Sequence, residues 1–234
     1  MMSTSEPRIL ILETSGRIGQ VALARGEAIL RSRRLDEARR HARDLVPAVA
    51  DLFKEEHWQP KDVQAVLVSR GPGSYTGLRV GIISAKTFAF ATGSPVLAVD
   101  TFAAIALQAP TAAHRLDVLA DAQQEKVYLQ SFARLGNGEW GPASDLQIQR
   151  LADWLAKRDL GAWVTGPGLR AYGSHLPEGT LMVDPTAWDP QPASILEIGL
   201  GRYQAGERDD LWTLEPLYLR PSSAEEKWGQ QSGK

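Results

Sequence analysis

VSRGPGSYTGLRVGIISAKTFAFA, from Val68 to Ala91, is the stretch that decides how the first part of the chain folds. It predicts the end of a strand, a glycine-rich turn and a helix that is apolar on nearly every side. Within the helix a glycine or an alanine recurs at every fourth position, and residues at that spacing form one stripe along a helix. Such a smooth stripe allows a second backbone to approach closely. We therefore predict a structural turn and a close-packing stripe made of Gly71, Gly73, Gly77, Gly81, Ala85 and Ala89.

The same turn raises the question of phosphate binding, because glycine loops that open a helix often hold phosphates. The P-loop pattern G-x-x-x-x-G-K-[ST] is absent. The dinucleotide pattern G-x-G-x-x-G is missed by one residue, since the glycines lie at Gly71, Gly73 and Gly77. Asp100 could pass for the ribose-binding acid, but it lies further along the chain than the about 20 residues that the pattern requires. We therefore expect no nucleotide at the turn and no cofactor.

The outward side of the helix is expected to bind a partner. At about 100° per residue, with Gly77 directed inward, the opposite side carries Arg79 and Lys86 flanked by apolar residues. A helix predicted from Arg43 to Glu56 also has a wider apolar arc than packing on one sheet requires. A third layer of this same chain could cover both helices, but its other helices are needed for the second half, so we favour a partner protein. The expected interface residues are Leu45, Val49, Leu52, Arg79, Ile82, Ile83, Lys86 and Phe90.

Composition sets broad limits on the function. The chain of 234 residues has a formal net charge of −2 and is 43% hydrophobic, which is ordinary for a globular protein and gives no overall attraction to nucleic acid or membranes. The absence of cysteine excludes a disulfide framework and a cysteine-based zinc site. The N-terminus lacks the features of a signal peptide, and no apolar run of about 18 residues is free of charge. We expect a cytoplasmic protein with no membrane contact.

The order of elements predicts an α/β chain in two similar halves. Strands are predicted at 8–15, 20–24, 28–33, 63–69 and 95–100, and helices at 43–56, at 77–91 and from 101 onward. The pattern then restarts, with strands at 116–123, 126–135, 162–168 and 180–185 and helices at 146–160 and 192–206. We assign residues 1–110 to a first lobe with the partner-binding helices, 111–220 to a smaller second lobe and 221–234 to a loose tail.

Several motifs carry a resemblance to a known family. SRGPGSYTGLRVGI is the most specific, and HARDLVP, PVLAVDTFAAIA, DAQQEKVY and EPLYLRPSSA follow the same order along nearly the whole chain. Together they resemble the TsaB (YeaZ) family. The resemblance implies an actin-like (ASKHA) fold of two lobes, each a mixed sheet with crossover helices, in agreement with the doubled pattern.

The resemblance also implies a function. Members of the family are non-catalytic relatives of TsaD, the enzyme that places a threonylcarbamoyl group on the adenosine next to the anticodon of certain tRNAs. It implies a heterodimer with a TsaD homologue through the two N-terminal helices, a TsaE-like ATPase in the complex, and tRNA contact only through that complex. A homodimer through the same helices is a further possibility that the sequence leaves open.

Catalytic residues of the relatives are missing from the corresponding positions. TsaD carries a metal-binding His-x-x-x-His pair after the strand equivalent to residues 95–100, where this sequence has Thr101 and Ile105. Isoleucine has no donor atom, and none of the four histidines lies four residues from another. Glu13 lies at the end of the first strand, close to where actin-like ATPases use an acid in a phosphate loop, but the family more usually has Asp there. We expect neither metal nor catalysis; the rival readings are an actin-like small-molecule kinase and a metallopeptidase-like enzyme.

An arginine-rich segment between residues 25 and 43 has two readings. It could contact tRNA phosphates within a complex. No aromatic residue interleaves with the arginines to stack on bases, so a solvated edge of strand and loop is the expected reading.

Overall fold

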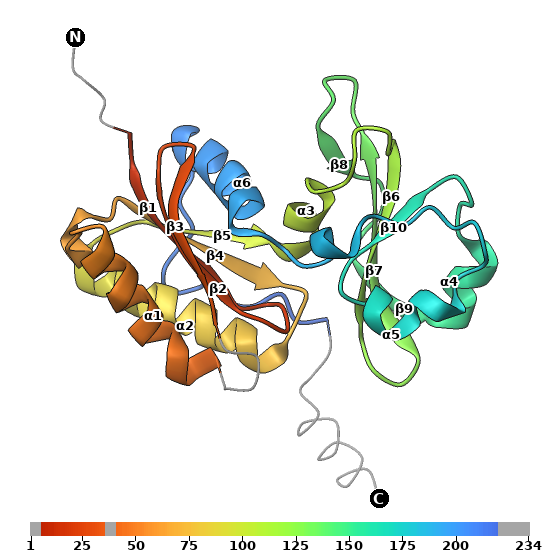
Figure 1. Ribbon diagram of the computed structural model, residues 1–234, viewed down its shortest axis with the longest axis horizontal. Coiled ribbons are helices and arrows are strands. Elements are labelled where there is room, and N and C mark those ends of the chain that lie inside the picture. Colours follow the sequence, from red (N-terminus) through yellow and green to blue (C-terminus); the bar gives the residue numbers. More distant parts are fainter. Residues whose placement is uncertain (1–5, 36–40, 220–234) are drawn as a thin grey trace, which may run out of the picture.

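The computed structural model describes residues 6–35 and 41–219, which form two lobes, each built on a five-stranded sheet (Figure 1). The first sheet has the order β3-β2-β1-β4-β5. Strands β1, β2 and β3 form an antiparallel meander, and β4 and β5 run parallel to β1. The strand bounds are β1 Arg8–Glu13, β2 Gln20–Arg25, β3 Ala28–Arg34, β4 Ala65–Gly71 and β5 Val96–Asp100.

Helices cover both faces of this sheet. Figure 1 shows α1 and α2 on one side of the sheet and α6 on the other. The strands alternate accordingly, because successive side chains point to opposite faces. Leu10 and Leu12 pack toward α1 and α2, whereas Ile9 and Ile11 pack toward α6. The helices here are α1 His41–Glu55, α2 Tyr75–Thr92, α3 Thr101–Ala106 and α6 Pro192–Gln204, with a short 3₁₀ turn at Pro60–Asp62.

The second lobe repeats the arrangement on a smaller scale. Its sheet has the order β10-β6-β7-β8, with β9 also paired to β7. Strands β6, β7 and β8 are antiparallel and β10 is parallel to β6, as β4 is to β1. The elements are β6 Arg115–Asp121, β7 Lys126–Arg134, β8 Trp140–Pro142, β9 Gln147–Arg150, α4 Leu151–Lys157, β10 Trp163–Thr165 and α5 Leu169–Tyr172, with 3₁₀ turns at Gly173–His175 and Pro185–Ala187.

The last part of the chain returns to the first lobe, which corrects the division at residues 110 and 111. Helix α6 buries Ile195, Leu196 and Leu200 against the first sheet, and Gly199 passes directly over the side chain of Leu67. After α6 the chain continues along the same lobe, where Asp209 pairs with Val96 through a backbone bridge. The sequence contains an apolar helix at this point but nothing that says which sheet it covers.

Three predicted elements also need correction. Helix α1 begins at His41, so Pro47 lies inside it, on an exposed face, and not in its first turn. Residues 147–150 form strand β9, which pairs with β7, where a helix was predicted. The strand predicted at 180–185 is reduced to a single bridge between Met182 and Val164. The predicted tail at 221–234 lies outside the described residues.

The buried side of α2 differs from the prediction. Gly77, Gly81 and Ile82 are all buried, so the inward arc is centred about 80° from Gly77 and not on it. Ile82 is 2% exposed and packs in the core, and its assignment to the outward, partner-binding side of the helix is therefore wrong. Leu45 and Leu52 of α1 are each 1% exposed in the same core, so they too are unavailable to a partner while the helix is docked on the sheet.

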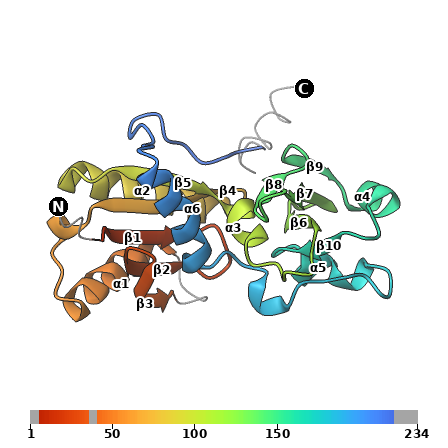
Figure 2. The ribbon, with the colours of Figure 1, turned by 90° about the horizontal axis from the view of Figure 1, so that it is seen from above.

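Part of the outward side of α2 is covered by the chain itself. The segment after α6 runs beside this helix (Figure 2), and the ammonium of Lys86 donates hydrogen bonds to the carbonyls of Trp212 and Leu214 at 3.2 and 3.1 Å. The rings of Phe90 and Trp212 meet edge to face with centroids 5.9 Å apart. Within the described residues, no helix is long and apolar enough to cross a membrane.

We predict that Ile82→Asp lowers the free energy of unfolding by about 3 kcal/mol or more, because it places an unpaired carboxylate in the core. Ile83→Asp, one residue further on the exposed side, is the matched control and should change stability by less than about 1 kcal/mol. Urea unfolding followed by circular dichroism measures both. Equal losses for the two variants would contradict this assignment of the two faces.

Candidate functional site

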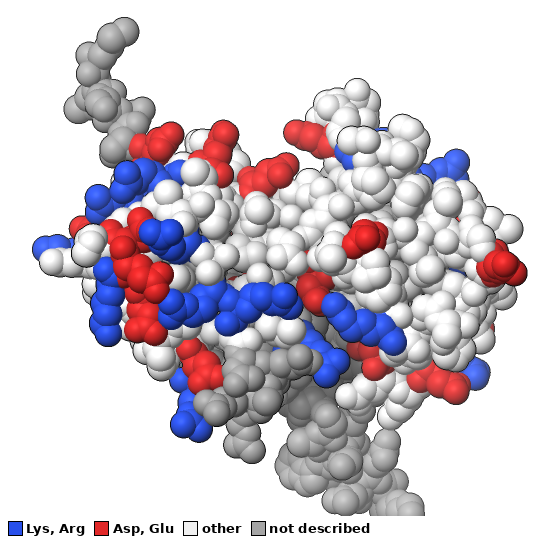
Figure 3. Space-filling view, in the orientation of Figure 1, with Lys and Arg blue, Asp and Glu red and all other residues white. Residues whose placement is uncertain are grey.

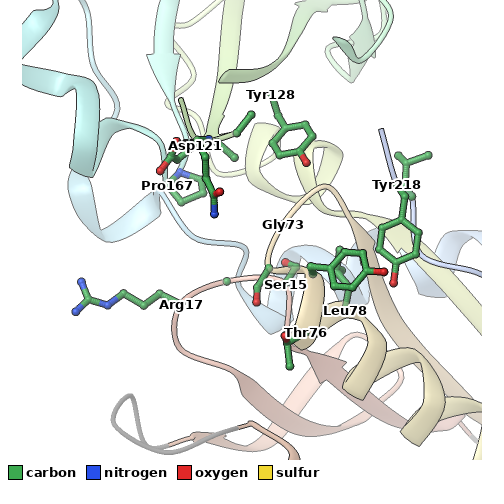
Figure 4. Close-up of a pocket in the computed structure, with 16 residues that line it drawn as sticks. Ser15, Arg17, Gly73, Thr76, Leu78, Asp121, Tyr128, Pro167 and Tyr218 are labelled. Carbon is green, nitrogen blue, oxygen red and sulfur yellow. Dashed lines mark hydrogen bonds between the residues drawn. The ribbon is translucent and has the colours of Figure 1, made fainter. Parts of the chain in front are cut away.

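A cavity of about 500 Å³ lies between the two lobes (Figure 4). The first lobe lines it with the end of β1 and the glycine turn before α2, and the second lobe with the β6–β7 turn and Pro167. The structure thus brings together two glycine turns that lie far apart in the sequence. The labelled side chains in Figure 4 come from both lobes, with Asp121, Tyr128 and Pro167 facing Ser15, Gly73 and Tyr218 across the space.

The glycine stripe packs against the end of β1. A Cβ atom on Gly73 would overlap the carbonyl oxygen of Ser15, and one on Gly77 would overlap that of Thr14. A Cβ on Gly81 would meet the Thr14 hydroxyl in the same way. The amide of Ser74 donates to the Ser15 carbonyl at 2.8 Å, which fixes the turn at this close approach. Glycine is therefore required here by backbone contact within the chain.

Hydrogen bonds hold both ends of the glycine turn before α2, at Gly71 and at Ser74. Gly71 has φ +117°, a conformation that side-chain-bearing residues rarely adopt. Its amide donates to the hydroxyl of Thr101 at 3.2 Å. The Ser74 hydroxyl accepts from the amide of Gly77 at 3.2 Å and so caps α2. The amides of Gly71, Ser74 and Gly77 thus have acceptors within the protein.

Glu13 is buried and serves the loop that follows it. One carboxylate oxygen accepts from the amide and the hydroxyl of Ser15, both at 2.6 Å, and from the amide of Gly16 at 3.0 Å. The other oxygen is buried and has no partner among the described residues. Burial raises the pKa of Glu13, against the hydrogen bonds from Ser15 and Gly16. Glu13 holds the loop in place and does not line the cavity.

The charged side chains that line the cavity are poorly placed to bind phosphate. Of the described lining residues, Arg17 and Asp121 are charged, and Figure 4 shows Arg17 extending away from the other labelled residues. The Asp121 carboxylate accepts from the Gln123 amide at 2.7 Å and from the Tyr172 hydroxyl at 2.8 Å. Burial, and then Asp121, raises the pKa of Tyr172 to about 12. The charge fixed at this wall is negative, which disfavours an anionic ligand.

Thr101 and Ile105, where the resemblance led us to look for a metal-binding pair, have structural roles. Thr101 is buried and bonds the glycine turn, and Ile105 is fully buried in the core between the lobes. A search of residues 6–35 and 41–219 finds no group of three His, Asp or Glu side chains placed to hold a metal.

Two arginines of the arginine-rich segment, Arg31 and Arg33, pair with acids in α1 and directly after it. Arg33 bonds Asp51 at 3.0 Å and Glu55 at 2.5 Å, and Arg31 bonds Glu56 at 2.8 Å. Toward the left of Figure 3, basic and acidic side chains lie side by side on the first lobe. Mixed charges of this kind form a solvated surface and not a uniform basic one. Arg39 and Arg40 lie outside the described residues.

The side of α1 and α2 that faces away from the first sheet, called the outward ridge below, is the second candidate site. Of the expected interface residues, Ile83 and Phe90 are 62% and 69% exposed, Arg79 is exposed, and Val49 and Lys86 are half-buried. Two further exposed apolar side chains of the first lobe were not predicted, Val46 on α1 and Trp212, which contacts Phe90. Trp212 could have been suspected as a bulky aromatic residue in a polar stretch, but its place beside α2 has no signal in the sequence.

Comparisons with known proteins agree on one family. A family model described as TsaD, tRNA N6-adenosine threonylcarbamoyltransferase, matches residues 35–160. The tRNA threonylcarbamoyladenosine biosynthesis protein TsaB of Bacillus subtilis (strain 168) is 28% identical over 227 residues, 94% of this chain and 97% of the relative. YeaZ from Pseudomonas aeruginosa is 30% identical with a TM-score of 0.75, and the match covers 91% of this chain and all of that one. The chain belongs to the TsaB (YeaZ) family.

This result confirms the family and the actin-like two-lobe fold expected from the motifs. A second TsaB, from Escherichia coli (strain K12), is 29% identical over 202 residues, 84% of this chain and 86% of the relative. The family is named for tRNA threonylcarbamoyladenosine biosynthesis. The residues matched by the TsaD model include the glycine turn, α2 and the positions of Thr101 and Ile105.

We predict a pH-dependent effect of Glu13 on stability. Because the pKa of Glu13 in the folded chain lies above its ordinary value of 4.5, the folded state binds this proton more tightly than the unfolded state. The resulting stabilisation is complete below pH 4.5 and is lost as the pH rises through the folded pKa.

The measurement compares the wild type with Glu13→Gln in urea unfolding across this range. The stability of the wild type relative to the variant should fall as the pH rises, because the aspartates with lowered pKa values are common to both proteins and cancel. If the stability of the wild type relative to the variant rose with pH, the folded state would favour the ionised form of Glu13, and the prediction would be wrong.

Proposed function

We propose that this chain is a non-catalytic subunit in the synthesis of threonylcarbamoyladenosine in tRNA, and that it supports a TsaD-type transferase by pairing with it. Membership of the TsaB family supports the pathway. The observation that carries the pairing is the group of exposed apolar side chains on α1, α2 and the adjoining segment. Four such residues gather on the first lobe: Val46, Ile83, Phe90 and Trp212.

The ridge has the make-up of a binding surface. Its apolar side chains are accompanied by cations, since Arg79 lies over the ring of Tyr75 and Lys86 is anchored by the carbonyls of Trp212 and Leu214. Aromatic and arginine residues contribute most to binding at protein interfaces. The same ridge would serve a homodimer, and a TsaE-like ATPase and tRNA would join through the complex. Because tRNA is modified in the cytoplasm, we place the chain there.

The absence of catalysis is part of the proposal and has its own support. One carboxylate oxygen of Glu13 accepts from backbone and hydroxyl groups and the other is buried, and Ile105 offers no atom to a metal. A kinase of this fold would need a phosphate site, and the charged residues that line the cavity between the lobes are one basic and one acidic residue, Arg17 and Asp121. Turnover of ATP with Mg²⁺ by the purified chain would instead favour the kinase.

We predict that Phe90→Asp weakens binding to the TsaD homologue of the same cell at least about a hundredfold, because it places a charge in the apolar contact. The matched control is Leu160→Asp, an apolar residue of the second lobe that is as exposed as Phe90. Calorimetry with the purified partner measures both, and circular dichroism checks that both variants are folded. Unchanged binding by Phe90→Asp would exclude α2 as the interface.

Removing the chain from its cell should lower threonylcarbamoyladenosine in tRNAs that read codons beginning with adenosine. The modified nucleoside is measured by mass spectrometry of digested tRNA. Wild-type protein should restore the level, and Phe90→Asp should fail to do so while Leu160→Asp succeeds. Normal modification in a deletion strain with no second homologue would refute the proposed function.

A further inference from the structure

The second lobe has a hollow of about 370 Å³ on the outer face of its sheet, beside α4 and apart from the cavity between the lobes. We propose that this hollow binds a small organic anion, one that carries a carboxylate or a phosphate group. The proposal does not depend on the proposed function of the chain. It rests on a change of side-chain character along one sheet face and on a buried arginine, Arg158, whose Nε lacks an acceptor among the described residues.

The sheet face changes from apolar to polar where α4 stops covering it. Helix α4 is seven residues long and packs Leu151 and Trp154 on Leu119, Val127 and Leu129. Further along the same strands, residues of the same alternation are polar, because every second side chain shares a face. These polar residues, together with two glutamines of β9, line the hollow: Arg115, Asp117, Ser131, Gln147 and Gln149.

Arg158, at the end of α4, is the buried arginine of this hollow. Its side chain is 9% exposed and lies over the ring of Trp154, 5.5 Å from the centroid. One guanidinium nitrogen donates to the carbonyl of Ala162 at 3.2 Å. The buried Nε has no acceptor among the described residues. The guanidinium group lines the hollow, so an anionic ligand there would meet a positive charge that makes no ion pair with any described residue.

The charges around the hollow favour an anion. Arg115 is paired with Asp159, whereas Lys157 and Arg158 make no ion pair with any described residue. Both oxygens of Asp117 are already used, one by the Ser131 hydroxyl at 2.6 Å and the other by the Trp154 indole at 2.9 Å. Ser131 and Trp154 are neutral and do not offset the charge of Asp117. The lining therefore has three basic side chains, Arg115, Lys157 and Arg158, against two acidic ones, Asp117 and Asp159, and the one net positive charge suits a carboxylate or a phosphate group.

The size of the hollow limits the ligand to a small molecule. Its volume lies near the lower end of the range of ligand pockets, about 300–1,000 Å³. With the anionic group at Arg158 and Lys157, the rest of the ligand would lie beside Gln147 and Gln149, which donate and accept hydrogen bonds. A small carboxylate or phosphate ester with further polar groups fits this description.

The test is titration of the full chain with inorganic phosphate and, separately, with succinate, followed by NMR of the Trp154 indole N–H. Because this group bonds Asp117 at the wall of the hollow, a ligand there should shift its signal saturably, with a dissociation constant of about 1 mM or below. Saturation by phosphate alone identifies a phosphate ligand, and saturation by succinate alone identifies a carboxylate. Sodium chloride at the same ionic strength controls for screening.

Variants of Lys157 and Arg158 test whether the shift of the Trp154 indole signal depends on these two cations. Arg158→Gln should weaken binding at least about tenfold, since a charge-assisted hydrogen bond is lost. Lys157→Gln, at an exposed position where folding is not at risk, should weaken it about threefold. The matched control is Arg208→Gln, an exposed arginine of the first lobe that also lies over an aromatic ring, and it should bind as the wild type does. No saturable shift with either anion, an equal shift with chloride, or unchanged binding by both test variants would overturn the proposal.

Discussion

The close approach of α2 to the end of β1 is the contact on which the rest of the first lobe depends. Side chains larger than hydrogen at Gly73 or Gly77 would meet the backbone of Ser15 or Thr14, so the helix could not lie where it does. That approach positions the turn before α2, one wall of the cavity between the lobes, and the burial of Glu13. A turn that looks suited to phosphate is thus explained by packing of one backbone on another, a use of glycine that needs no ligand.

The two sides of α2 have different surroundings. The side that carries the small residues and Ile82 belongs to the core, and the opposite side is only partly covered by the segment after α6. Because that segment adds Trp212 beside Phe90, the exposed surface is a product of distant parts of the chain. Binding of a partner there would depend on the relative position of α2 and this segment as well as on the side chains themselves.

Much of the fold could be predicted from the sequence, because local patterns determine it. The short apolar run of β1 has strand character, and the spacing of glycines in α2 follows from the geometry of a helix. The face of Ile82 was missed because a stripe of small residues marks one edge of the buried arc and not its centre. Strand β9 was taken for helix because four residues carry too little pattern to distinguish the two, and pairing with β7 decided the outcome. The cavity, Arg158 and Trp212 depend on contacts between distant segments, for which a single sequence has no signal.

The return of α6 to the first lobe has a consequence for synthesis on the ribosome. Strands β1 to β5 and helices α1 to α3 are synthesised early. One face of their sheet is covered only later, by Ile195, Leu196 and Leu200 of α6. Until these residues leave the exit tunnel, the apolar side chains of that face, Ile9 and Ile11 among them, remain uncovered. The second lobe, whose elements are contiguous from β6 to the turn after β10, can complete its core sooner. The lobe that is made first is therefore the one that is finished last.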